Sequence, residues 1–364
     1  GKWHNGEQYP FTPQGQGFEV AVGFNNGHWN DYFDPILLRG SQHEPMKGYI
    51  SDVLTDEAMK FITASGDEPF FCYLSYNAPH SPYQVPDAYF DKFKARGLDD
   101  KLAAFYGMCE NVDDNVGRLL AHLEAEKMAD DTVVLFLTDN GGTAGVKTFN
   151  AGMRGGKTSV HEGGTRVPLF MRWPAAKWDR VPDHIVSHID LFPTLLDLCG
   201  IEAPAGPKVD GITLRPLLEK AALGDWPERT LFTHNPISQT NKYPGAVRTQ
   251  KHRLVREIKG PAGGSKAQAN DASATPWQLY DMETDPGQSH DIAAEHPDLV
   301  KQLSAQYDTW FSDISSGGLQ RFPLPVGHAE HNPVELHAPQ AFFDPPLFFA
   351  SGPGFANDWL TGWT

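Results

Sequence analysis

The stretch that decides the fold is "TVVLFLTDNGG" at residues 132–142. Residues 133–137 are apolar without alternation, which is typical of a strand buried on both faces, and a polar Asp-Asn-Gly-Gly turn follows directly. The same design recurs in "PFFCYLSYNAPHSP" at residues 69–82, where an apolar run leads into a proline-rich polar loop. A third apolar run, "RVPLFMRWP", lies at residues 166–174. These strands predict an α/β fold with a mostly parallel sheet that is covered by helices.

A long helix is expected between the first two strands, with Asp99 or Asp100 as its N-cap. Its apolar residues are spaced alternately three and four apart, as on one face of a helix: Leu102, Phe105, Cys109, Val112, Val116, Leu119 and Leu123. "DLFPTLLDLCG" at residues 190–200 also predicts a helix, placed after the third strand.

The sequence pattern changes after about residue 225. Shorter alternating segments predict an antiparallel sheet, and "HPDLVKQLSAQYDTWFSDI" predicts an amphipathic helix that covers it. The Gly-, Ala- and Ser-rich residues 260–274 predict a mobile loop. We therefore expect an α/β core at residues 1–225, a smaller antiparallel α+β subdomain at 226–320, and an extension at 321–364.

Composition excludes several classes of function. There are 30 Lys and Arg residues against 46 Asp and Glu, a formal charge of −16, which disfavours nucleic acid as a partner. No apolar run approaches the roughly 18 residues that a membrane helix needs. The three cysteines are scattered and do not suggest a disulfide framework. An anionic small molecule remains a possible substrate if a local cluster of cations binds it, and the oligomeric state stays open.

Polar candidates follow the strands, where ligands gather at the carboxyl ends in α/β sheets. The candidates from four separate segments are Lys2, His4, His80, Asp139, Asn140, Lys157 and His161. Asp139 and Asn140 offer two hard oxygen ligands that suit Ca²⁺ or Mg²⁺, but Asp-Asn-Gly after a strand is also an ordinary turn. His80 is either a general acid or a loop histidine, and Lys157 either an anion ligand or a solvated lysine.

Taken together, these residues favour a catalytic site over the separate structural interpretations of each residue. Two lysines, two histidines and an Asp-Asn pair lie in glycine-framed loops beside core elements. Hydrolysis of an anionic ester needs such groups, because cations hold the nonbridging oxygens, a metal offsets charge and histidines transfer protons. Glu162 and Arg166 fit an internal ion pair better than a catalytic role.

The chain resembles the type I sulfatases of the alkaline phosphatase superfamily. The resemblance rests on a series of motifs in one order, over residues 1 to about 315: "GKWHNG", "NAPHSPYQVP", "TVVLFLTDNGG", "RGGKTSVHEGGTRVPLFMRWP", "HIDLFPTLLDLCG" and "WQLYDMETDPGQSHDIAAEHP". Asn5 departs from the leucine that is usual in the first motif. The resemblance implies an alkaline phosphatase-like fold, a calcium ion, and a sulfated carbohydrate or aryl sulfate as substrate.

The resemblance also implies roles for the candidates. Lys2 and Lys157 would bind the sulfate oxygens, with His161 as a further substrate contact. His4 would help to expel sulfate from a formylglycine nucleophile, and His80 would meet the leaving-group oxygen. Asp139 and Asn140 would be two of the calcium ligands.

One motif of the family is missing from these residues. The formylglycine nucleophile of type I sulfatases comes from a C/S-x-P-x-R motif, and the 364 residues contain none. We therefore expect the chain to be the C-terminal part of a longer bacterial protein, periplasmic or secreted, with nucleophile and signal peptide upstream. The alternatives are a phosphodiesterase or phosphonate hydrolase of the same superfamily, and a catalytically inactive protein that binds sulfated glycans.

Overall fold

The computed structural model describes residues 1–179, 181–219, 226–235, 241–258, 274–318 and 328–329. Its α-helices are α1 Ile50–Ser65, α2 Asp87–Lys94, α3 Asp100–Ala125, α4 Glu162–Thr165, α5 Leu191–Cys199, α6 Arg215–Glu219 and α7 Pro297–Ser315. Its strands are β1 Val22–Gly23, β2 Ile36–Arg39, β3 Gln42–Pro45, β4 Val134–Leu137, β5 Leu169–Arg172, β6 Leu231–His234, β7 Gly245–Arg248, β8 His252–Arg256 and β9 Gln278–Asp281. Single 3₁₀ turns lie at Gln14–Gln16, Ala129–Asp131, Ala144–Lys147, Pro174–Ala176 and His188–Asp190.

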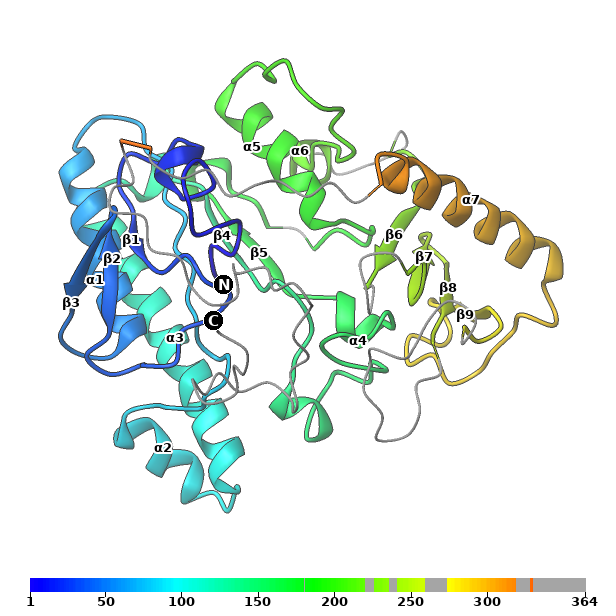
Figure 1. Cartoon of the computed structure of the whole chain (residues 1–364), viewed down its shortest axis with the longest axis horizontal. Helices are drawn as coiled ribbons and strands as arrows, with labels where there is room; N and C mark the ends of the chain where they lie inside the picture. The colour runs from blue at the N-terminus through cyan, green and yellow to red at the C-terminus, as the bar shows by residue number, and fades with distance from the viewer. Residues whose placement is uncertain (180, 220–225, 236–240, 259–273, 319–327, 330–364) are drawn as a thin grey trace, which may run out of the picture.

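The elements are arranged in two groups with a pair of strands between them (Figure 1). Helices α1, α2 and α3 and the sheet β1–β3 form one end of the molecule, and the sheet β6–β9 with α7 forms the other. Strands β4 and β5 cross the middle, and α4 lies between this pair and the C-terminal sheet. No helix among the described residues is both long enough and apolar enough to cross a membrane.

The predicted long helix is confirmed as α3 with Asp99 as its cap, but its buried face differs from the predicted one, of which only Val112 and Leu123 are buried. The Asp99 carboxylate accepts a hydrogen bond from the backbone N–H of Leu102 at 2.8 Å, which satisfies a donor at the first turn. Met108 and Val112 are buried in the same cluster as Ile50 and Val53 of α1. The helix at 190–200 is likewise confirmed, as α5.

The predicted parallel pairing is wrong for the strands that the structure describes. β4 and β5 pair antiparallel, with Val134 opposite Arg172 and Leu137 opposite Leu169. Every other strand pair in the described part of the chain is antiparallel too. Continuous apolar runs are typical of parallel strands covered on both faces, but these two strands are not covered in that way. All four residues of β4 are partly exposed, and Phe170 of β5 is 66% exposed.

The apolar run at residues 70–76 also differs from its prediction, because it forms no strand. Phe71 and Tyr73 are 62% and 54% exposed. An apolar cavity of about 140 Å³ borders this run, and its wall includes Phe18, Val22 and Leu54. The run therefore has a strand's composition without a neighbouring strand among the described residues.

The C-terminal antiparallel sheet is confirmed, in the order β6-β7-β8-β9. Its core is formed by buried residues of the sheet and of α7, namely Tyr243, Val247, Leu254, Leu279, Leu303 and Tyr307. The predicted loop at 260–274 lies outside the described residues except for Ala274, and so does the extension at 321–364 except for residues 328–329. The domain boundaries stay predictions.

Candidate functional site

The first loop of the site carries Lys2 and His4 on a fixed backbone. The His4 N–H donates to the Asn25 carbonyl at 3.2 Å, and the Tyr73 hydroxyl donates to the Lys2 carbonyl at 3.3 Å. His4 has φ +53°, in the left-handed region that non-glycine residues rarely adopt. The His4 ring lies so close to Gly27 that a Cβ there would be 2.8 Å from Nε2. Only glycine fits at position 27 without a shift of this ring.

The second loop presents His80 beside a histidine that the sequence analysis missed. The imidazoles of His28 and His80 stack with centroids 5.3 Å apart and planes inclined by 21°. The buried Tyr32 donates its hydroxyl to the His80 carbonyl at 2.5 Å, and Asn77 donates its amide to the Trp29 carbonyl at 3.0 Å. The segment 28–32 therefore holds the His80 loop from both sides.

The third and fourth loops are joined through their backbones. The Gly141 N–H donates to the Gly164 carbonyl at 3.1 Å, and the Lys157 N–H donates to the Gly142 carbonyl at 3.0 Å. These contacts link the turn after β4, which carries Asp139 and Asn140, to the loop of Lys157. Thr158, next to Lys157, has φ +73°, an outlier for a β-branched residue that the surrounding contacts must hold.

Electrostatic interactions show that the four loops converge. Burial lowers the pKa of His28, and the neighbouring His80, Lys2, His4 and Lys157 lower it further. Burial also lowers the pKa of Lys2, with a smaller effect of Lys157 in the same direction, while Asp139 opposes both. Such effects require short distances, since charges are screened beyond about 10 Å in water. The structure thus brings Lys2, His4, His80, Lys157 and Asp139 together, with His28 among them; we call this group the cation cluster.

The donor set at Asp139 and Asn140 suits a hard cation but is incomplete in these residues. A carboxylate and an amide carbonyl are ligands that Ca²⁺ and Mg²⁺ prefer, and Ca²⁺ takes about 6–8 oxygens. Within the described ranges no group of three His, Cys, Asp or Glu side chains is placed to hold a metal ion. His188 contacts this turn, with Nε2 2.9 Å from the Thr138 carbonyl oxygen. The chemistry of these two side chains fits two ligands of a hard divalent cation.

The His161 side chain contacts Tyr280 of the C-terminal sheet and Glu257, which follows β8. The side chain of His161 is 2% exposed, its Nε2 is 3.4 Å from a Glu257 carboxylate oxygen, and its ring meets Tyr280 edge-on. It precedes α4, where the chain turns back toward the C-terminal sheet. Its predicted contact with substrate is neither observed nor tested, and the buried position favours a structural role.

Glu162 and Arg166 form the expected ion pair, at 3.9 Å, but Glu162 has a closer partner. Its carboxylate lies 2.8 Å from the Arg253 guanidinium of β8, and both side chains are buried. Arg253 also donates to the Val160 carbonyl and to the Thr165 hydroxyl. This contact fixes the loop 154–166 to the C-terminal sheet.

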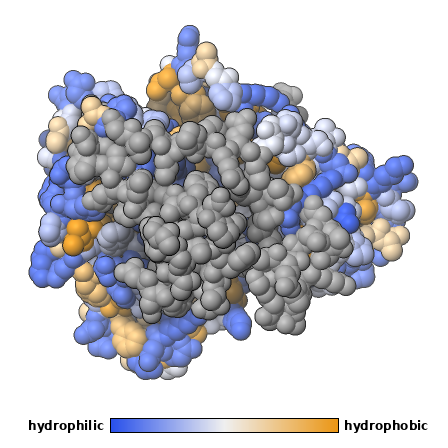
Figure 2. Space-filling view, in the orientation of Figure 1, coloured by the Kyte–Doolittle hydropathy of each residue, from blue (hydrophilic) through white to orange (hydrophobic). Residues whose placement is uncertain are grey.

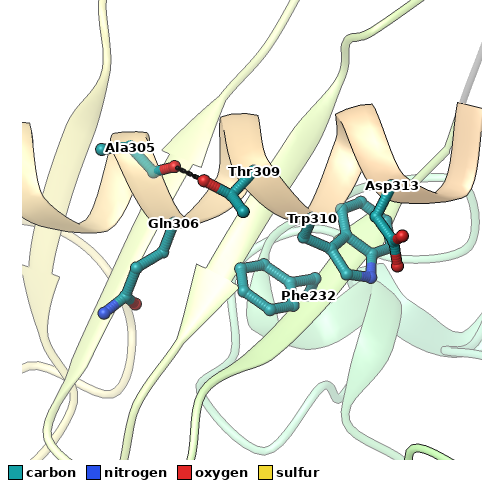
Figure 3. A pocket seen from close by; sticks show the side chains of 6 residues that line it. All are labelled: Phe232, Ala305, Gln306, Thr309, Trp310 and Asp313. Atoms are coloured by element: carbon teal, nitrogen blue, oxygen red, sulfur yellow. Dashed lines mark hydrogen bonds between the residues drawn. The ribbon is translucent and has the colours of Figure 1, made fainter. Parts of the chain in front are cut away.

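A groove of about 570 Å³ lies away from the cation cluster, where α7 lies over β6. It is lined mainly by Phe232, Trp310 and Gln306 (Figure 3). Thr309 donates its hydroxyl back to the Ala305 carbonyl, and the rings of Phe232 and Trp310 stack at 5.1 Å. In the view of Figure 2, hydrophobic side chains gather over α5. Phe192 of this helix is 48% exposed, and Ile201, which follows the helix, is 58% exposed. Neither surface carries a cluster of titratable groups.

Two family profiles match the sequence. The Sulfatase profile matches residues 1–201, and the profile of the N-sulphoglucosamine sulphohydrolase C-terminal region matches residues 156–311. Both include the loop of Lys157.

Individual relatives agree with these profiles. The chain is 30% identical over 332 residues to the uncharacterized sulfatase YdeN of Escherichia coli, covering 80% of this chain and 56% of YdeN. It is 26% identical over 322 residues to an N-acetylgalactosamine-6-O-sulfatase of Bacteroides thetaiotaomicron, covering 84% and 59%. The crystal structure of Ps i-CgsB in complex with k-i-k-neocarrahexaose matches with a TM-score of 0.71 and 26% identity, over 85% of this chain and 70% of that one. The chain thus spans little more than half of the two relatives' length, and its fold is alkaline phosphatase-like.

Proposed function

This chain belongs to the sulfatase family, and from that premise we propose that the whole protein hydrolyses sulfate esters of carbohydrates at the cation cluster. The observation that carries the proposal is the convergence of Lys2 and Lys157 with three histidines beside one carboxylate, Asp139. Such a cluster suits a substrate with a small, compact anionic group, because lysine acts as a point charge toward sulfate or phosphate. The names of the Bacteroides relative and of the neocarrahexaose complex support a carbohydrate over an aryl sulfate.

Each residue has a proposed part in the reaction. Lys2 and Lys157 bind the nonbridging sulfate oxygens and stabilise the charge that develops on them. His80 gives a proton to the leaving-group oxygen, and His4 takes a proton when sulfate is expelled from the nucleophile. The nucleophile is a formylglycine outside residues 1–364, since these lack the C/S-x-P-x-R motif.

A bound calcium ion is also part of the proposal. Asp139 and Asn140 would be two of its ligands, with Mg²⁺ as the alternative ion. When bound there, the cation would supply further positive charge next to the sulfate oxygens. We also propose a periplasmic or secreted location, because a sulfated polysaccharide is met outside the cytoplasm.

The direct test compares two substrates with the full-length protein. Turnover of a 6-O-sulfated N-acetylgalactosamine is measured beside turnover of a phosphate diester with the same leaving group. We expect the sulfate ester to be cleaved faster, with a loss of activity after chelation and a recovery with Ca²⁺. Faster cleavage of the diester would favour the phosphodiesterase alternative and contradict the proposal.

The chain of residues 1–364 gives a second test of the same proposal. We expect it to bind inorganic sulfate at the cation cluster without hydrolysing a sulfate ester, because it lacks the nucleophile motif. Turnover by this chain would show that a nucleophile lies within it. Sulfate binding by the full-length protein without turnover would favour the inactive glycan-binding alternative.

A further inference from the structure

We propose that His28 is a positioning residue of this site, whose imidazole stacks on His80 and fixes the orientation in which His80 meets the leaving-group oxygen. The inference rests on the proposed function, because it gives His28 a part in the same reaction. It concerns a residue that lies in none of the motifs from which the sequence analysis drew its candidates.

The first observation is the geometry of the two rings. Their centroids are 5.3 Å apart and their planes are inclined by only 21°, within the range of stacked aromatic pairs. The Nδ1 atom of His80 lies 2.7 Å from the Ser81 carbonyl oxygen, a contact with its own neighbour in the chain. This contact fixes one edge of the ring, and the His28 ring covers one face.

The second observation is that the segment around His28 is fixed to both catalytic histidines of the proposal. Gly27 packs under the His4 ring with no space for a Cβ. On the other side, the Trp29 carbonyl accepts from Asn77, and the fully buried Tyr32 donates to the His80 carbonyl. The stack is therefore built into the loop and does not depend on a freely rotating side chain.

The third observation concerns charge. His28 faces Lys2, His4, His80 and Lys157, and together with burial they lower the pKa of His28. A neutral imidazole adds no positive charge for an anion to bind, and it does not repel a protonated His80. The surroundings of His28 thus suit support of the neighbouring ring better than direct capture of sulfate.

Kinetics of the full-length protein separate these roles. His28→Phe keeps a flat ring but removes the ring nitrogens, whereas His28→Ala removes the stack. We expect His28→Ala to lower kcat about five- to tenfold, the usual effect of an aromatic pair, with KM within about twofold of native. His28→Phe should recover most of kcat. The matched control is His290→Ala, which removes an exposed histidine beside Glu295 far along the chain and should change neither constant.

Two kinetic results would overturn the inference. If His28→Phe and His28→Ala lose the same activity, the ring nitrogens matter and His28 touches substrate directly. If His28→Ala retains the native kcat, the stack has no part in the reaction.

A measurement without turnover distinguishes this inference from the proposed function. In NMR spectra of residues 1–364, the His80 ring protons should shift in His28→Ala, because the ring current of His28 is lost, and should stay near native in His28→Phe. Unchanged His80 signals in His28→Ala would overturn the stack itself. Shifted signals in residues 1–364, together with a full-length protein that hydrolyses no sulfate ester, would instead overturn the proposed function and leave the stack in place.

Discussion

Residues 154–166 contribute to two clusters of charged side chains. The two clusters differ in how many carboxylates are paired with their cations. At one end, Lys157 lies with Lys2 and the histidines, and among the described residues Asp139 is the carboxylate that acts on Lys2. At the other end, the Glu162 carboxylate is buried within 2.8 Å of Arg253 and 3.7 Å of Arg248. Cations paired with a protein carboxylate stabilise the fold, whereas cations in excess are available to an anionic ligand. Only four residues lie between Lys157 and Glu162, so one loop carries both clusters.

Replacement of Lys157 is expected to have the largest effect on activity. It tests directly whether the cation cluster binds the anionic group of the substrate. Lys157→Met removes a donor to the sulfate oxygens and should lower kcat of the full-length protein by about 10²–10³, as for other oxyanion donors. The free energy of unfolding should change by less than about 0.5 kcal/mol, because no buried pair is lost. Lys147→Met, at an exposed lysine ten residues earlier, is the control. Equal activity in the two variants would place the anion elsewhere.

Replacement of Arg253 is expected to have the next largest effect, on stability. It tests the cluster in which Glu162 is paired with arginines. Burial lowers the pKa of Arg253 to about 10, so it is charged at pH 7, and Arg253→Met would leave Glu162 buried with only its more distant partners. The free energy of unfolding in urea should fall by about 3 kcal/mol, the lower end for a broken buried pair. Arg172→Met, which breaks the exposed pair with Glu124, should cost less than about 1 kcal/mol.

A double variant shows whether the unpaired carboxylate causes this loss. Arg253→Met with Glu162→Gln should recover part of the stability, because a neutral amide is less costly to bury than an unpaired charge. If Arg253→Met is no less stable than Arg172→Met, the cluster does not hold the loop to the C-terminal sheet.

Elements whose signal is local were predictable from the sequence. The α3 helix has its cap within its own residues, and the short segments β6–β9 form the antiparallel sheet that was predicted. Their predicted alternation is not seen, because successive residues of β7 and β8 are buried. The direction of β4 against β5 was not predictable, because the residues of a strand do not specify which partner lies beside it. The run at 70–76 had the composition of a strand, but pairing depends on a neighbour that its own residues do not specify.

The candidate loops could be predicted where a motif marked them, whereas contacts between residues far apart in the sequence could not. Lys2, His80 and Lys157 were found because each lies in a glycine- or proline-framed loop. His28 was missed, although Gly27 beside it was the one available signal, an Asn-Asn-Gly turn before a histidine. His161 was expected to point toward the same pocket as Lys157 and to contact substrate. Its actual neighbour, Glu257, is ninety-six positions away and leaves no trace in the local sequence.

The smallest expected effect concerns the pair of His161 and Glu257. His161 lies next to Glu162, at the end of the loop where the cations are paired with a carboxylate. The contact with His161 lowers the pKa of Glu257 below its ordinary value of 4.5, although partial burial opposes the shift. A carboxylate whose pKa is lower in the folded protein stabilises the fold above the unfolded pKa, and this contribution is lost as the pH falls through the folded pKa. Glu257→Gln should therefore reduce the loss of stability between pH 7 and pH 4.

The measurement compares urea midpoints of native protein and variant at the two pH values. At pH 7 the variant should be less stable by under about 1 kcal/mol, because the Glu257 side chain is 40% exposed and solvent weakens the pair. At pH 4 the difference should shrink as the native carboxylate takes up protons. Glu295→Gln provides a matched control, since it removes the carboxylate of the exposed pair with His290, at 3.6 Å, and should change stability less at both pH values. If the stability difference between Glu257→Gln and the native protein grows on acidification, the Glu257 carboxylate is destabilised in the folded protein. The contact between His161 and Glu257 would then not stabilise the fold.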